Sequence, residues 1–191
     1  MADGNVTLAL IALGANLPAD GRAPANTLEQ AIARLTDHPD IAVAETSPWY
    51  RTEAVPAGSG PDFVNGAAIF KTQLSPQQML TQLHEVERAL GRTRTVRWEP
   101  RVCDLDLIAV GETILPDRPT ALSWIELSPE LAMKASPDRL ILPHPRMQDR
   151  SFVLVPLCDV APDWRHPLLG LTVKEMCDRL PPADLAGIQK L

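Results

Sequence analysis

Cysteine and aromatic residues are scarce in this sequence, and no apolar run is long enough to cross a membrane. The three cysteines, Cys103, Cys158 and Cys177, are odd in number and widely spaced. No CxxC pair or zinc-type Cys/His spacing accompanies them, which argues against a disulfide framework and predicts a reducing, cytoplasmic setting. The first residues also lack the basic segment of a secretory signal peptide, so the apolar run that follows is interpreted as a buried strand.

Basic residues are also fewer than acidic residues. The chain has 18 Lys and Arg against 24 Asp and Glu, a net charge of −6, which argues against nucleic-acid binding through a general basic surface. The 19 prolines are spread along the sequence instead of forming one low-complexity tract, and no internal repeat is present. At 191 residues, the chain is predicted to form a single domain, residues 1–191, with a substantial core.

Hydrophobic patterns predict an alternation of strands and helices. We expect strands near residues 6–13, 41–45, 63–72 and 103–110, and helices at 27–35 and 76–90. This order predicts an α+β fold of the ferredoxin-like βαββαβ type, a sandwich with a mainly antiparallel sheet. Extra helices towards the C-terminal end are also expected, at residues 128–134 and 172–180.

Helix-capping patterns support several of these helices. Ser75 is a suitable N-cap, Pro76 suits the first helical position, and Gly91 stands where a helix-ending glycine belongs. Asn26 with Glu29 is predicted to form a capping box for the earlier helix.

The segment GRTRTVRWEPRVCDLDLI, residues 91–108, combines basic and acidic groups in an acidic protein. Four arginines fall within ten residues, and two aspartates, Asp104 and Asp106, follow inside an apolar run. Arginine binds phosphate through planar, bidentate hydrogen bonds, and carboxylates bind magnesium that also contacts substrate phosphates. Side chains at i and i+2 of a strand share a face, so the two carboxylates should point the same way.

On their own, these aspartates would more often be solvated residues of an edge strand, because an Asp-x-Asp spacing is a common motif. Two close carboxylates repel unless a cation lies between them. The upstream arginines favour the second interpretation, a site for a metal-bound nucleotide.

Several segments together resemble one enzyme family. The segments are YRTEAV (50–55), PDFVNGA (61–67), GRTRTVRWEPRVCDLDL (91–107) and LPHPRMQDRSFVLVPL (142–157). They resemble, in order, the signature blocks of the 6-hydroxymethyl-7,8-dihydropterin pyrophosphokinase family, over most of the chain from Leu8 to about Pro162. The resemblance implies a ferredoxin-like fold, ATP as co-substrate with two Mg²⁺ ions, and transfer of pyrophosphate to the pterin hydroxymethyl group with release of AMP.

The resemblance also implies roles for individual residues. The implied catalytic residues are Arg92, Arg101, Asp104 and Asp106, and the two aspartates would hold the magnesium ions. The implied ATP-binding residues are His84, Glu87, Arg92, Trp98, Arg101, Arg139, His144 and Arg150. The implied pterin-binding residues are Thr52, Val55, Phe63, Asn65, Trp98, Asp104 and Phe152, with Phe63 and Phe152 on the two faces of the ring.

Several of these residues have simpler interpretations. Phe63 and Phe152 lie in apolar runs and could be ordinary core residues. His84 and Glu87, three apart on a helix, could be a solvated pair, and His144 between two prolines could cap a turn. His38 and His166 are interpreted as surface residues.

Two of the departures from the family pattern bear on the predicted site and on the shape of the protein. Glu99 stands where the family usually has glycine, next to the predicted catalytic arginines. The segment at about 116–138 is longer than its family counterpart and partly apolar, which suggests a surface flap or a subunit contact. The protein is expected to be a monomer or weak homo-oligomer with small-molecule partners only, ATP and a pterin, and neither nucleic acid nor membrane.

Two other functions remain as alternatives, which the order of the matching segments favours less. A nucleotidyltransferase with a ferredoxin-like palm would use two metals but release pyrophosphate. A non-catalytic ferredoxin-like module would bind ligand without turnover.

Overall fold

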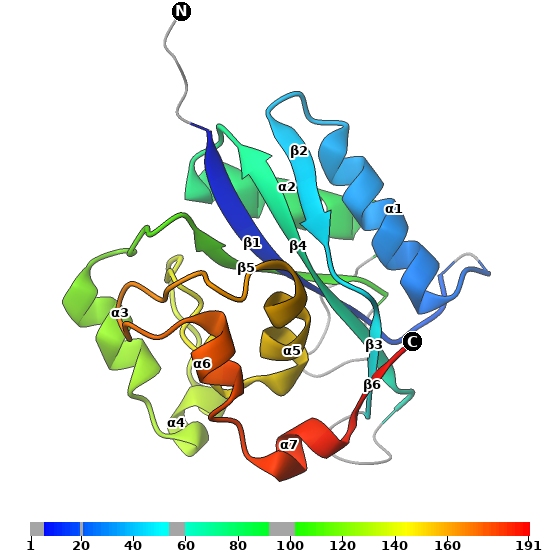
Figure 1. Cartoon of the computed structure of the whole chain (residues 1–191). Coiled ribbons are helices and arrows are strands. Elements are labelled where there is room, and N and C mark those ends of the chain that lie inside the picture. The colour runs from blue at the N-terminus through cyan, green and yellow to red at the C-terminus, as the bar shows by residue number, and fades with distance from the viewer. Residues whose placement is uncertain (1–5, 20, 54–59, 92–101) are drawn as a thin grey trace, which may run out of the picture.

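The computed structural model describes residues 6–19, 21–53, 60–91 and 102–191. Its centre is a six-stranded sheet with helices on both faces (Figure 1). The strands are β1 (Thr7–Ala15), β2 (Ile41–Thr46), β3 (Tyr50–Thr52), β4 (Phe63–Thr72), β5 (Asp104–Val110) and β6 (Ile188–Lys190). The helices are α1 (Pro24–Thr36), α2 (Pro76–Ala89), α3 (Arg118–Ile125), α4 (Pro129–Lys134), the 3-10 turn η1 (Met147–Asp149), α5 (Ser151–Val160), α6 (Val173–Cys177) and α7 (Pro182–Ala186).

The strands follow the order β5-β1-β4-β3-β6, with β2 also paired to β4. Every pairing between these strands is antiparallel. The prediction of a mixed α and β structure with a mainly antiparallel sheet is therefore confirmed. None of the helices in the described ranges is long and apolar enough to span a bilayer.

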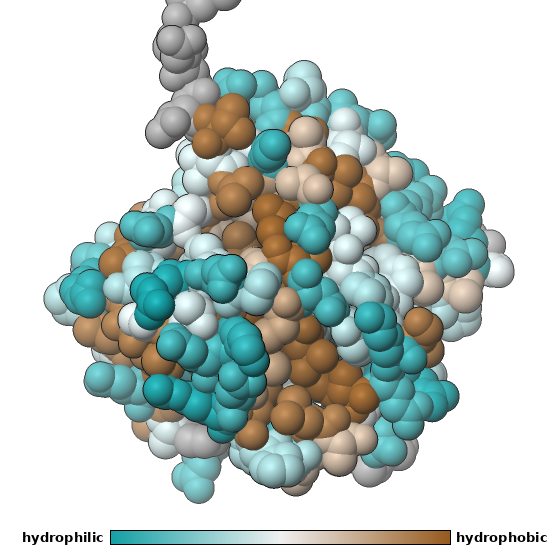
Figure 2. All heavy atoms as spheres, viewed as in Figure 1, coloured by the Kyte–Doolittle hydropathy of each residue, from teal (hydrophilic) through white to brown (hydrophobic). Residues whose placement is uncertain are grey.

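The central strand β1 is apolar on both faces because helices cover both sides of the sheet. Ile11 and Leu13 pack in the core that α1 and α2 complete, whereas Leu10 and Ala12 pack in the core completed by α5 and α6. On the α5 and α6 side of the molecule, Figure 2 shows apolar side chains in patches that polar residues divide. The sheet thus separates two cores.

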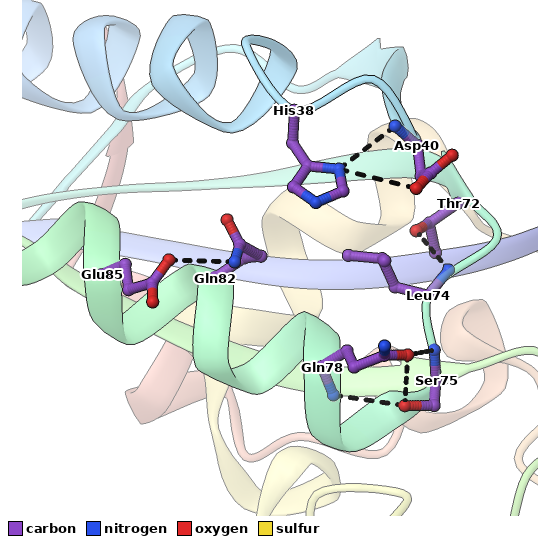
Figure 3. Close-up of polar contacts among 8 residues, drawn as sticks. All are labelled: His38, Asp40, Thr72, Leu74, Ser75, Gln78, Gln82 and Glu85. Carbon is purple, nitrogen blue, oxygen red and sulfur yellow. Dashed lines mark hydrogen bonds and ion pairs between the residues drawn. The ribbon is translucent and has the colours of Figure 1, made fainter.

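Capping chemistry explains where α2 begins and ends. The hydroxyl of Ser75 accepts the Gln78 N–H at 3.3 Å, and the Gln78 side chain accepts the Ser75 N–H at 2.9 Å (Figure 3). Gly91 follows with φ +91°, the conformation that favours glycine after a helix. The predicted start and end of this helix are confirmed.

The earlier helix, α1, begins three residues before its predicted start. Its N-cap is Ala23, which makes no side-chain capping bond, so the predicted capping box of Asn26 and Glu29 is wrong. Pro24 explains the difference, because its fixed φ and missing N–H suit a first helical turn without a capping side chain.

The later part of the chain was predicted less completely. α4 begins after Ser128, whose hydroxyl accepts the Leu131 N–H, as expected. α6 begins with the predicted capping box of Thr172 and Glu175 but ends at Cys177. The helices α3, α5 and α7 and the last strand, β6, had no counterpart in the predicted elements.

Candidate active site

The two aspartates of β5 point to the same face of the sheet, as predicted. Asp104 and Asp106 are half-buried, whereas Leu105 between them is buried against the other face, in the core with α1 and α2. The carboxylates therefore lie on the face that α5 covers. This alternation is the period-two pattern of a strand, and it brings both acids to one surface.

Strand pairing sets an asparagine across from the aspartates. Asp104 is paired with Gly14 on β1, and Gly14 is paired with Asn65 on β4. Asp106, two residues further along β5, is paired with Ala12 on β1. Because adjacent strands are about 4.8 Å apart, the backbones at Asp104 and Asn65 are about 10 Å apart.

Glycine at position 14 keeps the strip between these residues bare. A Cβ atom there would lie 3.1 Å from Oδ1 of Asn65, tighter than ordinary van der Waals contact. Gly14 therefore adds no side chain between Asp104 and Asn65, and the missing Cβ leaves room for the amide oxygen of Asn65.

Asn65 is buried, with 5% of its surface exposed, and its amide is oriented by a neighbouring strand. Its Nδ2 donates a 2.7 Å hydrogen bond to the hydroxyl of Thr52 on β3. Phe63, two residues before Asn65, shares its sheet face and is half-buried. Three of the predicted pterin-binding residues, Thr52, Phe63 and Asn65, are thus brought together.

The start of α5 adds a cation and an exposed aromatic ring. Nη1 of Arg150 donates to Oδ2 of Asp106 at 3.4 Å, and the guanidinium carbon lies 5.7 Å from the centre of the Phe152 ring. Phe152 is 39% exposed, so its interpretation as an ordinary core residue is wrong. Arg150 therefore connects the acidic pair to an aromatic surface.

His144 lies beside β5 in a neutral state. Its backbone N–H donates to the Ile108 carbonyl at 2.8 Å, and its Nδ1 accepts the Arg146 N–H at 3.2 Å. Burial lowers the pKa of His144 to about 3, and the positive charge of Arg150 acts in the same direction. Because Nδ1 accepts a hydrogen bond, the ring proton of the neutral form is on Nε2. The predicted turn-capping contact is present, and it leaves Nε2 as the donor.

Glu87 lies beneath β5 and is almost fully buried. Its Oε1 accepts the backbone N–H of Leu105 at 2.8 Å, between the two aspartates. Its interpretation as part of a solvated pair with His84 is wrong, while the predicted contact with ATP stays a prediction. Arg139 is exposed and ion-paired with Asp138 at 3.1 Å.

Several predicted residues lie outside the described ranges. They are Val55, Arg92, Trp98, Glu99 and Arg101. Sequence reasoning missed the bare strip at Gly14 and the contact of Arg150 with Asp106. The glycine before Asn16 was visible in the sequence, but its position opposite both Asp104 and Asn65 follows only from strand pairing.

The carboxylates of Asp104 and Asp106 suit a magnesium ion whose other ligands are mainly substrate phosphate oxygens. Within the described ranges no group of three or more His, Cys, Asp or Glu side chains could hold a metal ion. Mg²⁺ usually takes one or two protein carboxylates and completes its octahedron with water and substrate phosphate oxygens. Asp104 and Asp106 therefore fit an ion that arrives with a nucleotide.

Comparison with known proteins identifies the family. Residues 10–162 match the family model of 7,8-dihydro-6-hydroxymethylpterin-pyrophosphokinase, abbreviated HPPK. The chain belongs to the HPPK family. The resemblance inferred from the sequence segments is thereby confirmed.

HPPK relatives match over most of the chain. The 2-amino-4-hydroxy-6-hydroxymethyldihydropteridine pyrophosphokinase of Pseudomonas aeruginosa is 37% identical over 180 residues, covering 91% of this chain and 96% of the relative. The enzyme of the same name from Synechocystis is 36% identical over 155 residues, covering 81% of this chain and 69% of the relative.

Solved structures share the HPPK fold at low sequence identity. A wild-type Plasmodium falciparum HPPK-DHPS, crystallised with pteroate, matches with a TM-score of 0.65 and 14% identity. The match covers 92% of this chain but only 44% of that one, so the chain spans under half of the longer protein.

Proposed function

We propose that this chain transfers pyrophosphate from ATP to 6-hydroxymethyl-7,8-dihydropterin, giving AMP and the pterin diphosphate in folate biosynthesis. One observation carries the proposal. Asp104 and Asp106 face the same side of the sheet as the oriented amide of Asn65, across the bare backbone of Gly14. This arrangement supports a phosphate end on β5 and a pterin end on β4, with β1 between them, in a chain of the HPPK family.

The acidic pair forms the phosphate end of the site. Asp104 and Asp106 would hold two Mg²⁺ ions, which when bound neutralise phosphate charge and orient the attacking hydroxyl. The contact of Arg150 with Asp106 supports this role, because it places a positive charge where a triphosphate would lie. Neutral His144 offers an N–H donor next to the same charges. His84, Glu87 and Arg139 complete the proposed ATP pocket.

The proposed pterin end of the site depends on a side-chain amide that can hydrogen-bond the edge of the pterin, and on two aromatic rings that can stack on its faces. Thr52 fixes the Asn65 amide, so that its oxygen and remaining N–H can face the edge of the heterocycle. Phe63 and Phe152 would stack on its two faces, with Val55, Trp98 and Asp104 completing the pocket. The exposure of Phe152 supports this role, because a core phenylalanine would be covered.

Catalysis would be mostly positioning and electrostatics, because phosphoryl-type transfer leaves little covalent work for the protein. Arg92 and Arg101 would stabilise charge that develops on the transferred group. Arg92→Ala or Arg101→Ala should therefore lower turnover more than ATP affinity. Loss of affinity with unchanged turnover would contradict this role.

The architecture supports two wider proposals. With β2 and β3 counted as one interrupted strand along β4, the elements from β1 to β5 follow the order β-α-β-β-α-β. This order and the sheet order β5-β1-β4, with β2 and β3 beyond β4, support a ferredoxin-like classification. We also propose that residues 1–191 act as one domain, with the segment at about 116–138 as an insertion. A monomer or weak homo-oligomer in a reducing cytoplasmic setting remains part of this proposal.

The test is a product assay. The protein is incubated with ATP, magnesium and 6-hydroxymethyl-7,8-dihydropterin, and we expect AMP that depends on the pterin. Release of pyrophosphate instead would indicate a nucleotidyltransferase, and binding without any product would indicate a non-catalytic module. Either result would overturn the proposed function.

Variants of the acidic pair identify the site. Asp104→Asn and Asp106→Asn should each lower AMP formation by at least about a hundredfold, because each removes a metal-binding charge. The matched control is Asp178→Asn, an exposed acid on the far end of α6 that pairs with Lys174. Circular dichroism should show that all three variants fold, and equal activity in all three would place the chemistry elsewhere.

A further inference from the structure

We propose that β6 is a positioning element for the pterin end of the site. It holds β3 in the place from which Thr52 orients Asn65. The inference rests on the proposed function, because it assigns this role to strands that the proposed pterin pocket uses.

The strand that carries Thr52 is short and is held from both sides. β3 has three residues, and it pairs with β4 along one edge and with β6 along the other. Thr52 is paired with Phe63 on β4 and with Ile188 on β6. Just beyond β6, the Leu191 N–H donates to the Trp49 carbonyl at 2.9 Å. Without β6, β3 would be a three-residue edge strand, a marginal element.

A further contact ties β3 to α5. The hydroxyl of Tyr50 donates to Oδ2 of Asp159 at 2.6 Å. Burial and the neighbouring carboxylate raise the pKa of Tyr50 to about 12, which keeps this donor protonated. Tyr50 is paired with Asn65 on β4 and with Lys190 on β6, so the row of paired residues that begins at Asp104 ends on β6.

The effect on the site passes through one hydrogen bond. Thr52 accepts from Nδ2 of Asn65 at 2.7 Å, and this bond decides which end of the amide faces the strip at Gly14. A small displacement of β3 would break the bond and free the amide to rotate. We expect weaker and less selective pterin binding, while Asp104 and Asp106, three strands away, keep their positions.

The register of β6 separates backbone from side-chain effects. The bond between Leu191 and Trp49 makes that pair a hydrogen-bonded one, so the alternation of an antiparallel ladder assigns Arg51 and Gln189 to the next hydrogen-bonded pair. The N–H of Gln189 then points to β3, and that of Lys190 points away from it. The side chains of Arg51 and Gln189 are also hydrogen-bonded to each other.

Two proline variants of the full chain test the proposal. Gln189→Pro removes a donor to β3, whereas Lys190→Pro removes an N–H that faces away and is the matched control. Gln189→Ala removes only the side-chain contact with Arg51. Pterin and ATP dissociation constants, kcat and the thermal midpoint are measured for each, together with an enzyme truncated after Gly187.

We expect Gln189→Pro and the truncated enzyme to bind pterin about tenfold more weakly, the effect of losing roughly one buried hydrogen bond. ATP affinity and kcat at saturating pterin should stay within about twofold, a split that a general loss of structure would not produce. Lys190→Pro and Gln189→Ala should behave like the wild type.

Three results would overturn the inference. They are unchanged pterin affinity in Gln189→Pro, equal losses for pterin and ATP, and failure of the Gln189→Pro protein to fold, which would make β6 a folding element only. An inactive wild type is a different result, because it contradicts the proposed function and not the role of β6 alone.

Discussion

His144 and His166 are both kept neutral by burial, but only His144 lies near the acidic pair. His166 is fully buried, and its Nδ1 accepts the N–H groups of Leu168 and Leu169 at 3.2 Å each. Its Nε2 has no hydrogen-bond partner among the described residues. Burial lowers the pKa of His166 to about 4. Its interpretation as a surface residue was wrong, because the turn that encloses it forms only when residues 163–172 fold back on themselves.

The two histidines predict a loss of stability in mild acid. Their folded pKa values lie below the ordinary 6.5, so the unfolded chain binds more protons as the pH falls from about 6.5 towards 4. The contribution of these histidines to the free energy of unfolding should therefore be fully present above pH 6.5, and it should decrease as the pH falls below 6.5. His166→Asn keeps an acceptor near Nδ1 but cannot titrate, so its decrease should be shallower by up to about 1.4 kcal/mol per pH unit.

Urea unfolding at pH 7.5, 6 and 5 measures this difference. Parallel curves for the wild type and His166→Asn would show that His166 contributes nothing to the acid sensitivity of the fold.

Single residues of the site were predictable where a sequence segment carries their chemistry. Asp104, Asp106 and Asn65 were predicted from their segments, and the structure brings them to one sheet face. Glu87 was judged from its helical spacing to His84, which cannot report that β5 covers it. The partner that buries a side chain comes from another part of the chain, so local spacing does not contain it.

At the scale of elements, α2 and β5 are joined through a buried acid. β5 is an end strand of the sheet, and the N–H of Leu105 is satisfied by Glu87 instead of by another strand. Glu87 therefore fixes the strand at the residue between the two aspartates. The alignment of the acidic pair depends on this helix as well as on β1.

Replacing Glu87 should affect both stability and turnover. Glu87→Leu leaves the Leu105 N–H buried without an acceptor and should lower the free energy of unfolding by about 1–3 kcal/mol. Glu87→Gln keeps an accepting oxygen and is the control, with a smaller loss. Urea unfolding and AMP formation are measured together, and equal stability of the two variants would show that the hydrogen bond is unimportant.

Trp49 and Gly66 form a second contact between elements. A Cβ atom at position 66 would lie 2.5 Å and 2.6 Å from ring atoms of Trp49. Gly66→Ala should therefore destabilise the fold by about 1–3 kcal/mol through overpacking. In a Trp49→Leu background the same change should cost much less, because the ring atoms are gone. Thermal unfolding of the four proteins gives the coupling energy, and a value near zero would contradict the clash.

Elements with local signals were predicted, and elements without them were not. Ser75, Gln78 and Gly91 mark α2 in the sequence because caps are local chemistry. β6 is three residues long and exists because β3 offers it an edge. α3 follows an Asp117 cap, but its weak periodicity gave no buried stripe to detect.

At the scale of the whole molecule, the segment at about 116–138, which we propose to be an insertion, is closed at its base. Leu115 and Leu142 exchange two backbone hydrogen bonds, at 2.9 Å and 3.1 Å, so the two ends of the excursion lie side by side. Within α3, only Ala121 is buried. The excursion extends from the sheet and is visible at one side of the molecule in Figure 1.

Replacing residues 117–138 with a short Gly-Ser linker should leave the fold intact. The thermal midpoint should change by less than about 5 °C, because few buried side chains are lost. A fall in AMP formation would support a flap, and a fall in oligomeric mass by light scattering would support a subunit contact. If neither changes, the segment is a passive excursion, and a large loss of stability would show that it belongs to the core.

The unsubstituted backbone at Gly14 has a consequence for how the site can vary. Two inter-strand spacings separate the backbones that carry Asp104 and Asn65, so rotamer changes can move only the ends of these side chains. The backbone therefore sets most of the ligand breadth that fits between these two strands. The proposed aromatic rings above the sheet would set the ligand thickness that fits. Chemical analogues that differ in breadth should be rejected more sharply than analogues that differ in what projects upward from the ring.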